Sequence, residues 1–152
     1  MRVDVFKGDR EALRSLFREA DDSESEIDAY LSAGDVLVAD EDGEIVGHVQ
    51  LVAGDRADLE LKSMAVAEGH RGRGVGRALV EAALQHCRDR GAPRITVSTA
   101  AADTGNLRFY QRQGFRLLLI ERDVFGPDAG YAEGIVIDGI PLRDRVWLDQ
   151  EL

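Results

Sequence analysis

The chain has 152 residues, the usual length of one domain, so we expect residues 1–152 to fold as a single domain whose 44% hydrophobic content fills a packed core. The net charge of −10 argues against nucleic-acid binding, no apolar run is long enough to cross a membrane, and the single cysteine, Cys87, excludes an intrachain disulfide framework. Because Met1–Lys7 also lacks the apolar stretch of a signal peptide, we expect a cytoplasmic protein with no nucleic-acid or membrane partner.

The first third of the chain predicts one strand and two helices. Residues 2–6 alternate between apolar and polar side chains, which is typical of a strand. Residues 11–20 carry apolar side chains at helical spacing. Ser23 and Glu26 form a capping-box pattern, which predicts a second helix that begins there and runs toward Ala33.

The middle of the chain predicts a hairpin and a further strand. Two apolar runs, residues 36–39 and 45–52, flank Asp42-Gly43, a pair that favours a tight turn. Residues 59–66 then form a third strand. The elements expected after it are a helix over 76–90, a strand over 95–99, a helix over 106–113, and strands over 115–122 and 146–148. This order indicates an α/β protein with a mixed sheet rather than a purely parallel one.

A loop rich in glycine and arginine, Arg71-Gly-Arg-Gly-Val-Gly-Arg77, joins the strand over 59–66 to the helix over 76–90. Glycine lets backbone N–H groups approach phosphate oxygens closely, and the start of the helix adds more free N–H groups and the positive end of its dipole. The three arginines supply full positive charges and forked donors. The loop therefore predicts a pyrophosphate site.

Three kinds of phosphate loop must be distinguished. A Walker A loop ends in Gly-Lys-Ser/Thr, whereas this loop contains no lysine. A dinucleotide-binding loop starts close behind its strand and is followed by an acid at the end of the next strand; here four residues separate Val66 from Arg71, and the next strand ends in Ser98-Thr99. The third kind, Arg/Gln-x-x-Gly-x-Gly/Ala, matches Arg71-x-x-Gly74-x-Gly76.

That third pattern resembles the coenzyme-binding motif of the GNAT superfamily of N-acetyltransferases. The resemblance extends over residues 61–79, and Phe109-Tyr110-Gln-Arg-Gln-Gly114-Phe115 is similar to the second signature of that family. Both motifs occur in the family's order. The resemblance covers residues 1–125 well and residues 126–152 poorly. It implies a GNAT acyltransferase fold, with a central mixed, twisted sheet of about 6–7 strands flanked by about four helices.

The resemblance also implies an enzyme that uses acetyl-CoA as co-substrate and needs no metal. In the family, the strand before the loop splays from its parallel neighbour, and its main chain pairs with the pantetheine arm. Many members carry an asparagine seven residues before the tyrosine, where this chain has Asp103; Asn106 is either its substitute or simply a residue of the first turn of the helix. The residues expected to bind the coenzyme are Met64, Ala65, Val66, Arg71, Gly72, Arg73, Gly74, Val75, Gly76, Arg77 and Asn106.

Two residues are expected to carry the proton transfers. Tyr110 occupies the family position of the general acid, which returns a proton to the leaving thiolate. Glu60 lies on the strand six residues before Val66, where certain members carry a glutamate base. His48, on the preceding strand, is a competing base, since its ordinary pKa suits the role. A water relay with no dedicated base is a further alternative.

The acceptor is expected to be a small-molecule or peptide amine. In GNAT proteins the acceptor site lies between the first two helices and the C-terminal part. Acidic side chains in this region suggest a site for the ammonium group of the acceptor. The resemblance also allows a homodimer. The alternative to an enzyme is a non-catalytic acyl-CoA-binding sensor on the same fold. The candidates for the ammonium site are Asp21, Asp22, Glu24, Glu26, Asp123, Asp128, Tyr131 and Glu133.

Overall fold

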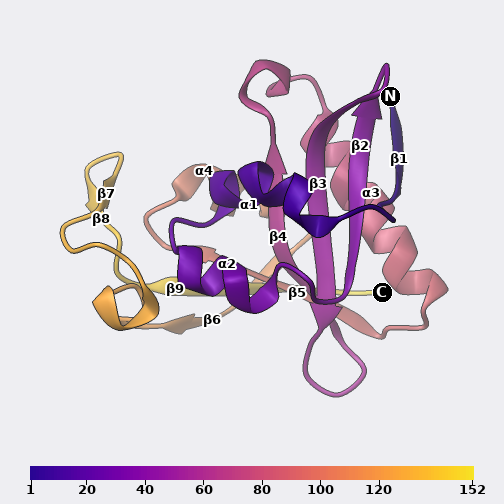
Figure 1. The fold of residues 1–152 in the computed structure, drawn as a ribbon. Helices are drawn as coiled ribbons and strands as arrows, with labels where there is room; N and C mark the ends of the chain where they lie inside the picture. The colour runs from indigo at the N-terminus through magenta and orange to yellow at the C-terminus, as the bar shows by residue number, and fades with distance from the viewer.

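A seven-stranded mixed sheet forms the centre of the protein in a computed structural model that describes residues 1–152 (Figure 1). The strands lie in the order β1-β2-β3-β4-β5-β9-β6, and only β4 and β5 run parallel to each other. A separate two-stranded hairpin, β7–β8, extends beyond the sheet. The strands are β1 (Arg2–Val5), β2 (Asp35–Glu41), β3 (Glu44–Ala53), β4 (Leu59–Val66), β5 (Arg94–Ala100), β6 (Arg116–Glu121), β7 (Val136–Ile137), β8 (Ile140–Pro141) and β9 (Arg145–Glu151).

Four α-helices cover the two faces of this sheet. In Figure 1, α1 and α2 lie in front of it and α3 lies behind. None of the helices is long and apolar enough to cross a membrane. The helices are α1 (Arg14–Ala20), α2 (Glu24–Tyr30), α3 (Val75–Asp89) and α4 (Thr104–Arg112), with short 3-10 helices at Arg10–Leu13, Glu68–His70 and Pro127–Ala129.

Each face of the sheet has its own apolar core. The larger core packs α3 against the middle of the sheet and includes Leu79, Val80 and Ile95. The smaller core joins α1 and α2 to β2 through Phe17 and Ile27. This arrangement confirms the expected mixed sheet of six to seven strands with four helices.

The turns and caps follow the local sequence. Asp42 and Gly43 both adopt positive φ, as the tight turn between β2 and β3 requires. Ser23 caps α2 by accepting a hydrogen bond from the Glu26 N–H at 3.3 Å. Cys87 is completely buried in the α3 core, and burial raises the pKa of its thiol to about 11.

Three helix boundaries differ from the expected ones. The segment expected as a helix over 11–20 begins as a 3-10 turn, because Asp9 accepts from the Glu11 N–H at 3.0 Å. The second helix ends at Tyr30 rather than near Ala33, because Gln50 and Arg10 satisfy the carbonyls that follow. The last helix begins at Thr104, two residues early, because Asp103 caps it through the Asn106 N–H at 2.9 Å.

Candidate functional site

The two parallel strands separate at their carboxyl ends and open a cleft. β4 pairs with β3 as far as Val66, but it pairs with β5 only from Leu59 to Leu61. A β-bulge at Lys62 lies at the point where β4 stops pairing with β5. The main chain of residues 63–66 therefore has no strand partner on its β5 side. The resulting cleft has a volume of about 800 Å³.

One end of this cleft, the loop end, is formed by the loop over 71–77 and the start of α3. Gly72 and Gly74 adopt φ of +73° and +84°, a conformation that L side chains rarely take, while the space beside them is open. Gly74 is the N-cap of α3, so the first N–H groups of a 15-residue helix are available at the cleft. The loop end is thus shaped and polarised to hold an anion.

The arginines of the loop are placed differently. Arg71 and Arg77 line the cleft, whereas Arg73 does not, since it turns to Glu41 at 3.2 Å. Arg71 donates to the Val66 carbonyl at 2.9 Å and pairs with Glu19 at 2.6 Å. Of the coenzyme-binding residues expected from sequence, the cleft is lined by Met64, Ala65, Val66, Arg71, Gly72, Gly74, Val75, Gly76, Arg77 and Asn106.

Tyr110 lines the middle of the cleft from α4. It is only 6% exposed and packs edge-on against Phe109 and Phe115, which fixes its ring. Burial, with a smaller contribution from Asp103, raises the pKa of its hydroxyl. Its hydroxyl, which like any phenol is protonated at neutral pH, borders the cleft.

The two candidate bases have contrasting surroundings. Glu60 is half-buried and does not line the cleft; burial raises the pKa of its carboxyl, while Lys62 and Arg145 oppose that rise. His48 is completely buried against the Phe17 ring and bonds Ser63 Oγ through Nε2 at 2.8 Å. Burial lowers the pKa of His48 to about 3, which makes it a weak base.

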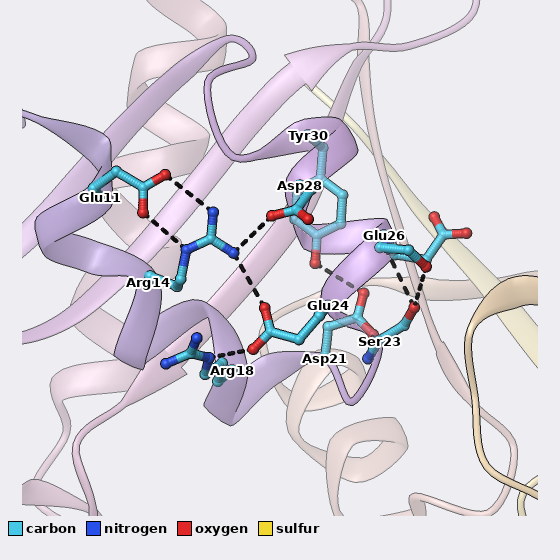
Figure 2. Close-up of polar contacts among 10 residues, drawn as sticks. Glu11, Arg14, Arg18, Asp21, Ser23, Glu24, Glu26, Asp28 and Tyr30 are labelled. Carbon is cyan, nitrogen blue, oxygen red and sulfur yellow. Dashed lines mark hydrogen bonds and ion pairs between the residues drawn. The ribbon is translucent and has the colours of Figure 1, made fainter.

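The other end of the cleft, the Asp21 end, is organised by Asp21 between α1 and α2. Tyr30 and Tyr131 each donate a hydrogen bond of 2.8 Å to its carboxylate, one to each oxygen. Figure 2 shows Tyr30 reaching back to Asp21 from the end of α2. Burial, together with Asp21, raises the pKa of both tyrosine hydroxyls.

Ion pairs fix the two helices that carry Asp21. Arg14 of α1 pairs with Glu24 of α2 at 3.1 Å and with Asp28 at 2.8 Å, while Arg18 pairs with the other oxygen of Glu24 (Figure 2). These pairs are exposed, so each contributes little to stability. They link α1 to α2 on either side of the loop that carries Asp21, while the buried contacts of Phe17 and Ile27 hold the two helices together.

The C-terminal segment closes the Asp21 end by docking on the start of α2. Ser23 Oγ donates to the Ala129 carbonyl at 2.8 Å. A Cβ on Gly130 would lie 2.3 Å from Ser23 Oγ and 2.4 Å from Ser25 Oγ, so only glycine allows this close approach. The segment thereby brings Phe125 and Tyr131 to the cleft.

The acidic residues expected to bind an ammonium group are not gathered in one place. Asp21, Asp22 and Tyr131 line the cleft. Glu24 instead pairs with the arginines of α1. The residues that do not line the cleft are Glu24, Glu26, Asp123, Asp128 and Glu133.

Two cations at the cleft had no assigned role in the sequence reasoning. Lys62 lines it from the bulge of β4, and Arg145 lines it from the start of β9. Lys62 lies two residues before Met64, and this position could have predicted that Lys62 lines the cleft. No local pattern predicts the same of Arg145, because it reaches the cleft only through the insertion of β9 between β5 and β6.

Comparison with known proteins places the chain among acetyltransferases. Residues 4–115 match the family described as "Acetyltransferase (GNAT) family". The chain is 30% identical over 151 residues to the uncharacterized N-acetyltransferase YvbK of Bacillus subtilis, covering 98% of this chain and 96% of that protein.

Solved structures with coenzyme bound have the same fold over nearly the whole chain. An acetyltransferase of Bacillus subtilis in complex with CoA is 30% identical, with a TM-score of 0.91 and coverage of 99% of this chain and 98% of that one. A GNAT family acetyltransferase of Elizabethkingia anophelis with acetyl-CoA bound is 29% identical, with a TM-score of 0.91 and coverage of 99% and 97%.

Proposed function

The chain belongs to the GNAT family of acetyltransferases, and from that premise we propose that it moves an acetyl group from acetyl-CoA directly to a primary amine. One observation carries the proposal. β4 loses its β5 partner after Leu61, so a free strand edge over residues 63–66 precedes the anion-binding loop over 71–77. Two structural relatives hold CoA or acetyl-CoA.

The loop end suits the pyrophosphate of the coenzyme. The N–H groups at the start of α3, together with Arg71 and Arg77, provide the donors and the positive charge. The unpaired main chain of Met64, Ala65 and Val66 provides a strand edge for the pantetheine arm. Arg73, also expected to bind the coenzyme, lies outside the cleft and is paired with Glu41.

Tyr110 is the proposed general acid. Acetyl-CoA supplies the acetyl group as a thioester, and transfer breaks its C–S bond while a C–N bond forms to the amine. A phenol carries its proton at neutral pH whether or not burial raises its pKa, so the Tyr110 hydroxyl has a proton available for the departing sulfur. The same burial raises the basicity of the thiolate, which favours the transfer.

Glu60 is the proposed base, acting through water. The amine must lose a proton as the C–N bond forms, and a carboxylate whose pKa is raised by burial is better matched to that step near neutral pH. Because Glu60 does not line the cleft, the proton reaches it through water in this proposal.

The test is a CoA-release assay with acetyl-CoA and a panel of amines, run beside calorimetric binding of acetyl-CoA. We expect amine-dependent release, and we expect Tyr110→Phe to lower kcat by about 100-fold with acetyl-CoA affinity unchanged. Tyr131→Phe is the matched control, since it removes a hydroxyl at the Asp21 end and should act on the KM of the amine. Binding of acetyl-CoA without release for any amine would support a non-catalytic sensor and contradict the proposal.

A further inference from the structure

The side chains at the Asp21 end form a continuous series of contacts. Lys62 Nζ lies 5.0 Å from the centre of the Tyr30 ring. Tyr30 and Tyr131 are joined through Asp21, and the Tyr131 ring meets Phe125 edge-on with centroids 5.2 Å apart. The members of this series come from α2, β4 and the C-terminal segment, so the series is assembled only in the folded chain.

Arg145 is the last member of this series and lies over the Phe125 ring. Its guanidinium lies 5.2 Å from the centre of the Phe125 ring, and its one ion pair, with Glu121, is long at 3.5 Å. Lys62 forms no ion pair. Both cations face the cleft, and both act electrostatically on the carboxyl of Glu60. They therefore share one neighbourhood, in which Glu60 is the carboxyl group that both of them act on and neither of them contacts as an ion pair.

The carboxylate of Asp21, in contrast, is already engaged. Besides the two tyrosine hydroxyls, the Ser23 N–H donates to it at 3.0 Å. Asp22 is the acidic side chain that remains free beside it at the cleft. The walls between these charges are the apolar faces of Tyr30, Phe125 and Tyr131, with Ile137 and Leu142 beyond them.

We propose that the acceptor is a free α-amino acid with an apolar side chain, whose carboxylate is bound by Lys62 and Arg145. This inference rests on the proposed acetyl transfer and specifies its substrate class. The apolar walls accept the side chain, and the amine is left between the cations and the acidic loop of Asp21 and Asp22. A polycation would instead place positive charge against Lys62 and Arg145, which costs free energy.

The experiment compares each amino acid with its amide, which keeps the amine and the side chain but lacks the carboxylate. The probes are L-phenylalanine with L-phenylalaninamide and L-leucine with L-leucinamide, and spermidine is the polycation. CoA release gives kcat/KM for each. The amine of the amide has a lower pKa than the amine of the amino acid, so more of it is unprotonated and ready to react. This difference favours the amide and therefore works against the expected preference for the amino acid.

Lys62→Met is the decisive variant, and Lys7→Met is its matched control, because Lys7 is the other lysine of the chain and lies away from the cleft. We expect the wild type to prefer acid over amide by about tenfold or more, since a charge-assisted contact is lost with the amide. Lys62→Met should remove most of that preference, Lys7→Met none of it, and Arg145→Gln should act as Lys62→Met does.

Equal kcat/KM for acid and amide in the wild type would overturn the inference, as would a preference that survives Lys62→Met. Turnover of spermidine without turnover of either amino acid would also overturn it and leave acetyl transfer standing. Bound acetyl-CoA with no release for any probe or any amine of the wider panel would overturn both.

Discussion

Replacing Gly130 by alanine tests how the C-terminal segment shapes the Asp21 end of the cleft. Gly130 has φ of +85°, and an added Cβ would lie within 2.4 Å of both Ser23 Oγ and Ser25 Oγ. Those hydroxyls can only make room by rotating. Rotation of Ser23 breaks its cap on the Glu26 N–H and its bond to the Ala129 carbonyl.

The expected cost has two parts. An L residue at positive φ costs about 1–2 kcal/mol, and loss of the Ser23 cap costs about 1 kcal/mol more. Gly134 provides the matched control, since it has φ of +75° with no atom within 4 Å of an added Cβ. We therefore expect Gly130→Ala to lower the free energy of unfolding by about 1 kcal/mol more than Gly134→Ala does.

Urea unfolding of the two variants measures this difference, and kinetics show its consequence. Gly130→Ala should raise the KM of the amine because Tyr131 and Phe125 are displaced with the segment, while acetyl-CoA affinity stays unchanged. Equal destabilisation by the two alanines would refute the close docking of residue 130 on α2. An effect on acetyl-CoA affinity as large as the effect on the amine would refute its assignment to the acceptor side.

Three further predictions follow from other buried groups. Glu60→Gln should lower kcat and remove the fall in rate at acid pH, because burial raises the pKa of a carboxyl that must be ionised to act; Glu44→Gln, an exposed control, should leave the pH profile unchanged. Between pH 7 and pH 5 the free energy of unfolding of the wild type should fall by about 2 kcal/mol more than that of His48→Asn. The reason is that His48 has a pKa of about 3 in the folded state and its ordinary pKa in the unfolded state, so at pH 5 only the unfolded state binds the proton. Urea titrations with the same pH dependence in both proteins would exclude this. Cys87 should resist thiol reagents in the native protein and react at the rate of an exposed thiol in urea, because it is completely buried with a pKa of about 11; rapid labelling of the native protein would contradict its place in the core.

The donor half of the site could be predicted from the sequence because its parts are contiguous. Spacing related Val66, the loop over 71–77 and the helix behind it, and the resemblance to the GNAT family assigned them to the coenzyme; the structure places most of these residues along one cleft. Arg73 is the exception, because its direction is decided by Glu41 on β2, a tertiary contact that no local pattern reveals.

The acceptor half could not be predicted in the same way, because its parts are distant in the chain. Asp21 meets Tyr131 across 110 residues, and Arg145 reaches the cleft only because β9 is inserted between β5 and β6. The sequence also does not distinguish one acidic residue of this region from another. In the structure Glu24 forms ion pairs with arginines, whereas Asp21 accepts hydrogen bonds from two tyrosines. Which charges remain free depends on these long-range partners.

The central claim is that the cleft between β4 and β5 holds acetyl-CoA with its pyrophosphate at the loop end. Calorimetric titration of the protein with acetyl-CoA and with S-acetyl-pantetheine, which lacks the pyrophosphate and the nucleotide, tests it most directly. We predict one acetyl-CoA bound per chain and a loss of affinity of about 100-fold or more with the truncated thioester, since several charge-assisted hydrogen bonds disappear. Equal affinity for the two thioesters, or no saturable binding of acetyl-CoA, would contradict the claim.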